Sequence, residues 1–263
     1  MKKILFFTLA VMILTACSSV LITGRKQLLL VSDADVLSMS ATAYKEFIDS
    51  VPASKDTVNT ALVKKVGNKI AEAVVAYLKA NGHEADVATL NWEFNLVKDT
   101  SVNAFCMPGG KVVVFEGILP VTMDETGLAV VMGHEIAHAI AKHSNERLSQ
   151  QMLAQYGAAL TDMLLSNKTA ATRQTINILY GIGAEVGVIL PYSRKHEYEA
   201  DRLGLIFMAM AGYDPNQAVD FWQRMSANGS GSLFEFLSTH PTDEHRIAKM
   251  KECLPEALGY VKK

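Results

Sequence analysis

The segment that most constrains this chain is the pentapeptide HEIAH at residues 134–138, which fits the pattern H-E-x-x-H. Apolar residues recur around it at spacings of three and four, which predicts a helix over residues 126–142. Residues four apart share one face of a helix, so the imidazoles of His134 and His138 could hold one zinc ion. Glu135 lies beside them and is predicted to take a proton from the attacking water. The pattern therefore predicts metal-assisted hydrolysis of a peptide bond.

A chance occurrence of this pattern is the alternative. Histidine accounts for 7 of 263 residues, so composition alone would produce H-E-x-x-H in roughly one such chain in a hundred. The helical setting removes more of these cases, and a purely structural role for the segment is the weaker interpretation.

A catalytic zinc site needs three protein ligands and one open position. The strongest source of the third ligand is the segment SRKHEYEAD at residues 193–201. On a helix, Glu197 and Asp201 lie one turn apart on one face, so Glu197 would bind the zinc and Asp201 would accept a hydrogen bond from a ligand imidazole. For two acidic residues at this spacing alone, a surface charge cluster is the better interpretation. The H-E-x-x-H segment and the fuller pattern around Glu197 reverse that preference.

The first 17 residues have the features of a targeting segment. Two lysines are followed by a short apolar stretch over residues 4–14, which ends in the sequence LTAC at residues 14–17. This ending resembles the lipobox of bacterial lipoproteins and predicts lipidation of Cys17. We therefore expect a lipoprotein signal peptide over residues 1–16, a lipidated tether over 17–30 and a single zinc metallopeptidase domain over 31–263. The alternative is ordinary signal cleavage, or an uncleaved anchor, with an incidental cysteine.

Hydrophobic periodicity predicts helices that begin near residues 33 and 57 and further helices over 145–165 and 169–190. Thr122 and Glu125 have the spacing of a capping box at the start of the active helix. Strands are predicted over 91–97, 101–105 and 111–115, with a turn at 108–110. The predicted class is α+β, mainly α-helical, with a small β-sheet beside the cleft. Its edge could accept an extended peptide near Asn103 and Ala104, or the sheet could simply pack on the helices.

Composition narrows the classes of partner and ligand. The formal net charge of −2 provides no electrostatic basis for nucleic-acid binding. The three cysteines Cys17, Cys106 and Cys253 have no spacing typical of a thiolate zinc site. We favour Cys106 and Cys253 as two separate small buried residues over a disulfide, because the sequence does not supply their distance.

Taken together, these segments resemble the M48 family of zinc endopeptidases, which includes the HtpX heat-shock proteases, the CAAX prenyl proteases and the Oma-type mitochondrial proteases. The matching stretches are Thr23–Leu28, Asn103–Gly117, the HEIAH segment, Ser193–Gly204, and Thr239-His240-Pro241 followed by Arg246-Ile247. The resemblance implies a zincin-type metalloprotease with one Zn²⁺ per chain on His134, His138 and Glu197. It also implies that Glu135 is the general base and that polypeptides are the substrates.

The sequence lacks the long transmembrane helices of the HtpX and prenyl protease branches, and so resembles the soluble lipoprotein branch of the family. That branch implies action on misfolded or membrane-associated envelope proteins. It also implies that the protein is anchored by lipid in a bacterial cell envelope. The protein would face the periplasm, where the outer membrane is one possible anchoring membrane, or it would face the cell exterior.

His240 precedes Pro241 in the family stretch T-H-P and is a third candidate catalytic residue. It could approach the open zinc position or hydrogen-bond the oxyanion formed during attack. It could instead brace the last helix. A rival function is a membrane-tethered chaperone or assembly factor whose zinc site is shielded and rarely cuts. A purely structural metal site is weaker, because such a site does not need Glu135.

Overall fold

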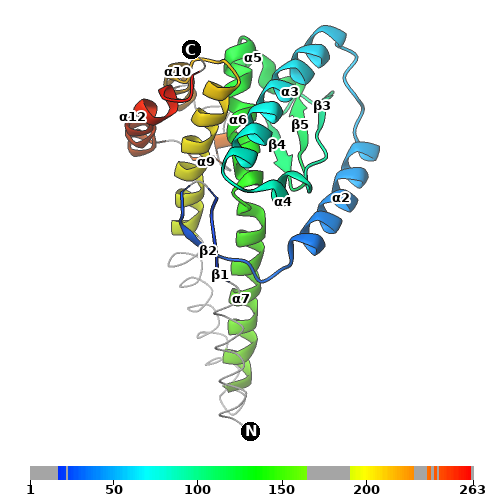
Figure 1. Cartoon of the computed structure of the whole chain (residues 1–263). Coiled ribbons are helices and arrows are strands. Elements are labelled where there is room, and N and C mark those ends of the chain that lie inside the picture. The colour runs from blue at the N-terminus through cyan, green and yellow to red at the C-terminus, as the bar shows by residue number, and fades with distance from the viewer. Residues whose placement is uncertain are drawn as a thin grey trace. The chain divides into compact units, whose positions relative to one another are not determined.

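The structure is a computed structural model that describes residues 17–21, 23–164, 190–227, 236–237, 240–241 and 243–261 (Figure 1). It is mainly helical with two small sheets, which confirms the predicted α+β class. The predicted signal peptide and nearly all of the helix expected over 169–190 lie outside the described residues. The chain divides into two compact units, Met1–Val36 with Lys142–His196, and Leu37–Ala141 with Glu197–Lys263. The boundaries predicted at residues 16 and 30 stay predictions.

The smaller unit contains a short hairpin and a long helix. Its elements are β1 (Cys17–Ser19), β2 (Lys26–Leu28), α7 (His143–Leu164) and the first turns of α9 (Leu190–Met210). Arg25, directly before β2, donates two hydrogen bonds of 2.8 and 2.6 Å to the buried carboxylate of Glu146 on α7. His196 Nε2 lies 2.9 Å from the same carboxylate. A buried charge network therefore joins the Thr23–Leu28 stretch to two helices of its own unit.

The larger unit is built on a three-stranded sheet of β3 (Glu93–Val97), β4 (Ala104–Met107) and β5 (Lys111–Phe115). The strand order is β3-β5-β4, with β3 parallel and β4 antiparallel to β5. Gly109 and Gly110 have φ values of 90° and 86°, a conformation that glycine adopts without strain, and they make the tight turn of the β4–β5 hairpin. The hairpin and the additional strand were predicted from the sequence, but the first strand of the hairpin runs over Ala104–Met107 rather than over 101–105. Cys106 on β4 and Cys253 are both free thiols, as expected, but only Cys106 is buried and Cys253 is half-buried.

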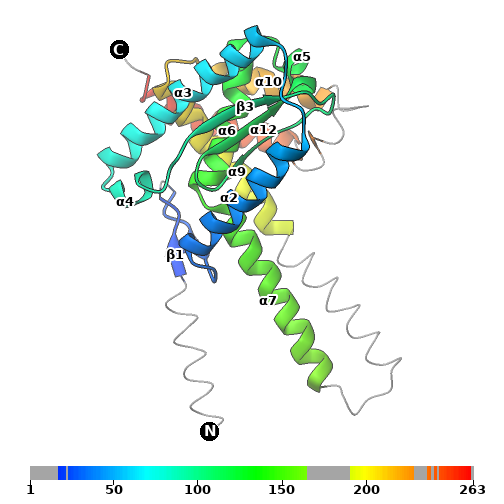
Figure 2. The ribbon, with the colours of Figure 1, turned by 90° about the vertical axis from the view of Figure 1, so that its right-hand side faces the viewer.

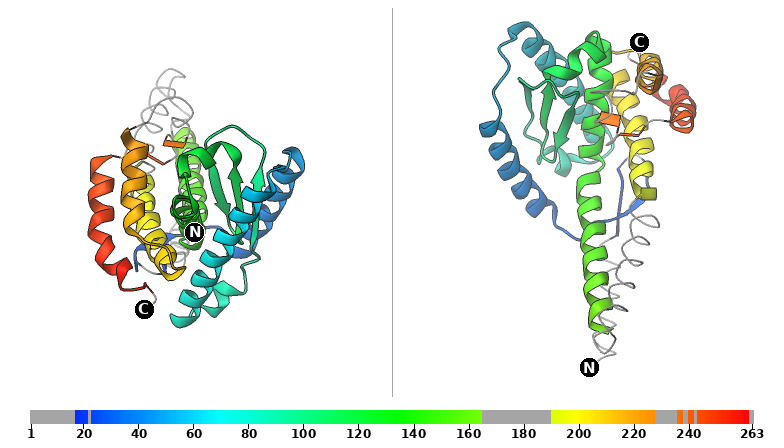
Figure 3. Two further views of the ribbon diagram at one scale, coloured as in Figure 1. Left: turned by 90° about the horizontal axis from the view of Figure 1, so that it is seen from above. Right: turned by 180° about the vertical axis from the view of Figure 1, so that it is seen from behind.

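Helices cover both faces of this sheet (Figures 2 and 3). On one face, α2 (Asp33–Ser50) packs Tyr44 and Phe47 against Val113 and Phe115 of β5. On the other face lie α3 (Thr57–Ala80) and α6 (Glu125–Ile140), which contact β3 and β4 respectively. Short helical segments connect these elements, namely α4 (Glu84–Val87), η1 (Glu116–Ile118) and α5 (Leu119–Thr122). The sheet thus fixes one side of α6 in the core.

The start of α6 differs from the prediction. Asp124 is the N-cap residue, and its side chain accepts a 2.8 Å hydrogen bond from the Gly127 N–H. Thr122 is instead the last residue of α5, where its hydroxyl donates to the Leu119 carbonyl. The capping box at Thr122 and Glu125 was therefore wrong, because a separate short helix ends at Thr122 and a third residue caps the next one.

A close helix crossing brings α9 onto the other side of α6. A Cβ atom added at Gly204 of α9 would lie 3.1 Å from the backbone nitrogen of His134, and one added at Gly133 would lie 3.2 Å from the Gly204 carbonyl oxygen. The two backbones approach this closely because both positions lack a side chain. Beyond this crossing, α10 (Asn216–Ala227) packs on α6 and on α12 (Glu244–Leu258).

Replacing Gly204 by valine should separate α6 from α9 at the crossing. We expect a loss of unfolding free energy of about 1–3 kcal/mol, as for other overpacked positions, together with reduced metal content, since both helices carry candidate ligands. Urea unfolding and metal analysis of the same purified sample measure the two effects. Wild-type values for both would show that the crossing has room for a side chain.

Candidate metal centre

Two histidines of α6 bring their ring nitrogens close together. His134 and His138 lie one helical turn apart, and their Nε2 atoms are 3.1 Å from each other. Their rings meet edge to face with centroids 4.7 Å apart. His134 is buried and His138 nearly so, and most of the helix around them is buried as well. Packing of α6 in the core therefore holds both imidazoles in place.

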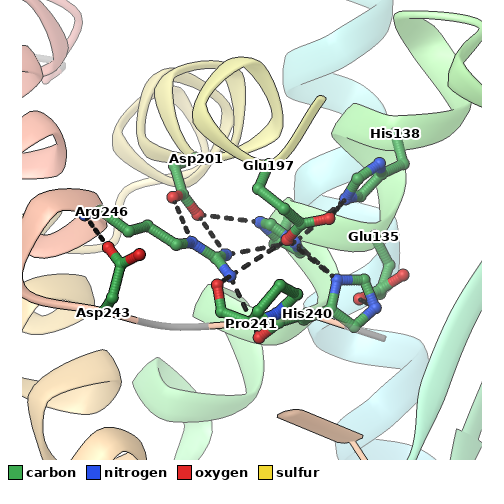
Figure 4. Close-up of polar contacts among 9 residues, drawn as sticks. Glu135, His138, Glu197, Asp201, His240, Pro241, Asp243 and Arg246 are labelled. Carbon is green, nitrogen blue, oxygen red and sulfur yellow. Dashed lines mark hydrogen bonds and ion pairs between the residues drawn. The ribbon is translucent and has the colours of Figure 1, made fainter. Parts of the chain in front are cut away.

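α9 supplies two carboxylates to the same region. Glu197 Oε2 lies 3.2 Å from His134 Nε2, and Glu197 Oε1 lies 3.3 Å from His138 Nε2. Asp201, one turn further along, places its Oδ1 3.0 Å from His134 Nδ1. Figure 4 shows both carboxylates projecting from α9 toward the α6 side chains. Because Glu197 and Asp201 are one helical turn apart, their carboxylates face the two different nitrogens of the His134 ring, Nε2 and Nδ1 respectively.

His240 lies at the same point, although it is 106 positions from His134 in the chain. Its Nδ1 is 3.2 Å from His134 Nε2 and 3.1 Å from Glu197 Oε2. Its other nitrogen, Nε2, is 3.4 Å from Glu135 Oε1. Of the two placements considered from the sequence, the structure has His240 beside the candidate ligands, in contact with them through its ring. Thr239 lies outside the described residues.

The spacing of these atoms fits a metal ion. One ligand atom each from His134, His138, Glu197 and His240 all lie within 4.8 Å of one another. In a tetrahedral site with zinc–nitrogen bonds of about 2.0–2.1 Å, neighbouring ligand atoms are about 3.3 Å apart. The separations of 3.1 to 3.3 Å within the group, measured to one or the other oxygen of Glu197, are close to this value. The group therefore fits one zinc ion per chain.

An unsatisfied carboxylate oxygen supports the same assignment. Glu197 Oε1 is buried and makes no hydrogen bond of good geometry among the described residues, although His138 Nε2 lies 3.3 Å from it. A buried carboxylate oxygen without a donor costs free energy, which a bound cation would offset. The second unsatisfied oxygen, Glu135 Oε1, lies next to His240 Nε2.

Asp201 determines which nitrogen of His134 faces the centre. With the Asp201 carboxylate beside Nδ1, the proton of neutral His134 is favoured on Nδ1, which leaves the Nε2 lone pair for a metal. Burial alone lowers the pKa of His134, but its hydrogen bonds to the carboxylates of Asp201 and Glu197 outweigh that effect and raise the pKa to about 9. A metal at this site would therefore compete with a proton.

Arg246 of α12 contacts the carboxylates of both Asp201 and Glu197. Its Nε and Nη2 donate to Asp201 at 2.7 and 2.8 Å, and its Nη1 lies 3.0 Å from Glu197 Oε2. Burial raises the pKa of Asp201, but the charge of Arg246 outweighs that effect and lowers it. The guanidinium also lies 4.2 Å above the ring of Trp222. No local sequence pattern singles out Trp222, since its position depends on how α10 packs.

The two acidic residues of the centre have opposite pKa shifts. Burial raises the pKa of Glu135, although His240 and His134 oppose it. Burial also favours a raised pKa for Glu197, but the surrounding histidines outweigh it and hold that pKa well below the usual range. Glu197 is thus kept as a carboxylate, while Glu135 becomes a stronger base than an exposed glutamate. This contrast is what a metal ligand and a proton acceptor require.

The two candidate substrate-binding residues lie at the edge of the sheet. Ala104 is the first residue of β4, which is an edge strand in the order β3-β5-β4. The side chain of Ala104 is buried. The carbonyl of Asn103 accepts a 3.1 Å hydrogen bond from the Phe115 N–H and so extends the β4–β5 ladder. α6 packs against β4. The sheet edge therefore runs alongside the helix that carries the histidines.

Comparison with known proteins identifies relatives for most of the chain. Mitochondrial metalloendopeptidase OMA1 of Schizosaccharomyces pombe is 42% identical over 65% of this chain and 49% of its own length. The human metalloendopeptidase OMA1, mitochondrial, is 30% identical over 90% of this chain and 46% of its own. Beta-barrel assembly-enhancing protease of Yersinia pestis is 29% identical over 81% of this chain and 42% of its own. The chain thus spans about half the length of these relatives.

These relatives correct the location expected from the sequence. The OMA1 proteins are mitochondrial by name, and this finding contradicts the prediction of a bacterial cell envelope. Within the part of the chain that the structure describes, no helix is both long and apolar enough to cross a membrane.

The family itself follows from a longer match. Residues 63–254 match Peptidase family M48. That range contains all four residues of the candidate metal group, together with Glu135, Asp201 and Arg246. The chain therefore belongs to Peptidase family M48, whose members are zinc metallopeptidases.

Proposed function

We propose that this chain is a zinc-dependent metalloendopeptidase in which His134, His138 and Glu197 bind the metal. The observation that carries the proposal is the convergence of these three side chains at tetrahedral spacing beside a buried glutamate. The family match and the names of the relatives agree with this activity.

The proposed mechanism assigns one task to each side chain. Zinc, when bound, would polarise the scissile carbonyl and acidify the attacking water. Glu135 accepts the proton of that water and delivers it to the leaving nitrogen, for which its raised pKa is suited. Asp201 holds His134 in the tautomer that presents Nε2. An extended substrate would lie along β4 near Asn103 and Ala104, where its backbone can pair with the edge strand.

His240 occupies the position that a catalytic site must leave open. Its Nδ1 lies 3.2 Å from His134 Nε2 and 3.1 Å from Glu197 Oε2, close enough to act as a fourth ligand, whereas hydrolysis requires a water and a substrate carbonyl at that position. We infer that the described arrangement is a resting state and that His240 must withdraw before cleavage.

Replacing His240 by alanine should therefore raise peptidase activity several-fold and weaken zinc binding. The expected rise follows from vacating the fourth position, and the weaker binding from the loss of one ligand. Casein cleavage rates at saturating zinc measure the first effect, and competition with a chromophoric chelator measures the second. A fall in cleavage with unchanged zinc affinity would instead assign His240 to oxyanion stabilisation.

The direct test of the proposed function uses the purified full-length protein in mild detergent. Zinc content and cleavage of an unfolded protein such as casein are measured on one sample. About one zinc per chain with cleavage supports the proposal, whereas a protein without zinc would contradict the ligand set. Zinc without cleavage would favour a chaperone or assembly factor with a shielded site, for which the position of His240 is the supporting observation.

Membrane attachment through an acyl chain on Cys17 is a separate proposal. It rests on the sequence LTAC at residues 14–17. Mass spectrometry of the purified N-terminal peptide tests it, with Cys17→Ser as the control. An unmodified Cys17 in membrane-extracted protein would contradict it.

A further inference from the structure

Arg246 is a buried cation that contacts several parts of the metal centre at once. Its side chain is 1% exposed and lies in the first turn of α12, where Asp243 caps the helix by accepting from the Arg246 N–H at 2.7 Å. The helix start and the ring of Trp222 together hold the guanidinium in one orientation. Such a buried, forked cation has a defined direction for each of its donors.

The first set of contacts is to carboxylates. Arg246 donates to both oxygens of Asp201 and lies 3.0 Å from Glu197 Oε2. Burial alone would lower the pKa of Arg246, but these carboxylates outweigh it and raise the pKa. The residue therefore places one fixed positive charge between the zinc ligand Glu197 and the carboxylate that orients His134.

The second set of contacts is to the backbone of His240 and of the residue that follows it. Arg246 Nη1 lies 3.3 Å from the carbonyl oxygens of both His240 and Pro241. Figure 4 shows the guanidinium between the α9 carboxylates and this backbone segment. The same group that binds the fixed ligands of α9 therefore also binds the segment that carries His240.

We propose that Arg246 is a positioning residue that holds His240 at the fourth position of the metal site by linking its backbone to Glu197 and Asp201. The proposal rests on the proposed function. Lysine at this position would keep the charge but could not donate in the directions of the fork. Arg246→Lys should therefore release His240 while leaving the buried carboxylates neutralised.

A matched control lies on the same pair of helices. Arg202 of α9 donates two hydrogen bonds, of 2.7 and 2.8 Å, to Glu256 of α12, at the surface and outside the metal group. Arg202→Lys loosens the contact between α9 and α12 without touching the centre. Any effect shared by both lysine variants would reflect general loosening of the two helices.

The experiment is a double-mutant cycle on the zinc-loaded, full-length protein. Zinc release to a chromophoric chelator is timed for wild type, Arg246→Lys, His240→Ala, the double variant and Arg202→Lys. The absorption spectrum of the Co²⁺-substituted forms reports the coordination in each. We expect Arg246→Lys to speed release about tenfold, as for other residues that support a ligand, and to shift the Co²⁺ spectrum toward that of His240→Ala. In the His240→Ala protein, the additional substitution Arg246→Lys should change the rate of zinc release only slightly.

Three results would overturn the proposal. In the first, Arg246→Lys releases zinc at the wild-type rate. In the second, Arg246→Lys speeds zinc release by the same factor in the wild type and in the His240→Ala protein. In the third, Arg202→Lys speeds zinc release as much as Arg246→Lys does. Each of these leaves zinc bound in the wild type, so the proposed function would stand. A wild type that holds no zinc would overturn both, and far-ultraviolet circular dichroism verifies that each variant is folded.

Discussion

Replacing Glu135 by glutamine is expected to reduce casein cleavage by about 10²–10⁴-fold while the protein keeps its zinc. The glutamine amide has nearly the same shape but cannot accept the proton of the attacking water. Glu135 Oε1 makes no hydrogen bond of good geometry among the described residues, and His240 Nε2 lies 3.4 Å from it. The loss should appear in kcat rather than in KM, because the residue acts on the reaction and not on substrate binding.

The matched control for this variant is Glu125→Gln in the same helix. Glu125 pairs with Lys65 and Lys69 at 2.6 and 3.2 Å and lies at the first turn of α6, outside the metal group. It should retain wild-type cleavage. Wild-type turnover by the Glu135→Gln protein would refute the assignment of the general base, and loss of zinc from it would show that the substitution damages the site itself.

Removing zinc with a chelator is expected to abolish cleavage and to lower Tm. In metal-free protein the Nε2 atoms of His134 and His138 lie 3.1 Å apart and 3.2 and 3.3 Å from the oxygens of Glu197, so that protons must take the place of the metal between these groups. Bound zinc that is present at about a thousand times its Kd adds about 4 kcal/mol to the free energy of unfolding, provided that the unfolded chain does not bind it. Thermal unfolding with and without chelator measures this difference, and added zinc should restore both properties.

Glu135→Gln provides the control for the expected loss of thermal stability when zinc is removed. Because Glu135 is not proposed as a ligand, its variant should lose as much thermal stability on chelation as the wild type. A His138→Ala protein should lose less, since it binds zinc more weakly at the start. Cleavage that persists in protein shown to be free of metal would contradict a zinc mechanism.

Local sequence patterns were sufficient to predict the two helices that carry most residues of the candidate metal centre. A spacing of four residues put His134 with His138 and Glu197 with Asp201, because each pair lies on one helix and helical geometry determines which residues share a face. The hairpin around residues 108–110 was predictable in the same way from its glycines.

The remaining contacts depend on tertiary packing and left no local signal. His240 lies in an irregular segment, so its approach to His134 follows from where α10 and α12 pack rather than from spacing. Arg246 was visible only as part of a family stretch, and its contacts with Asp201 and the His240 backbone require the folded chain. The N-cap of α6 was missed because two adjacent helices with different starts meet at residues 122–125.

The long sequence separation within the ligand set has a consequence for folding kinetics. His134 and His240 are 106 positions apart, and closing a loop of that length carries an entropy cost that must be met before the ends can interact. Zinc held by all four side chains of the resting arrangement therefore binds only after the chain has nearly completed its fold. Interactions that are absent from the transition state slow unfolding and leave the folding rate almost unchanged. Bound zinc should therefore prolong the lifetime of the folded molecule, and its loss would shorten that lifetime.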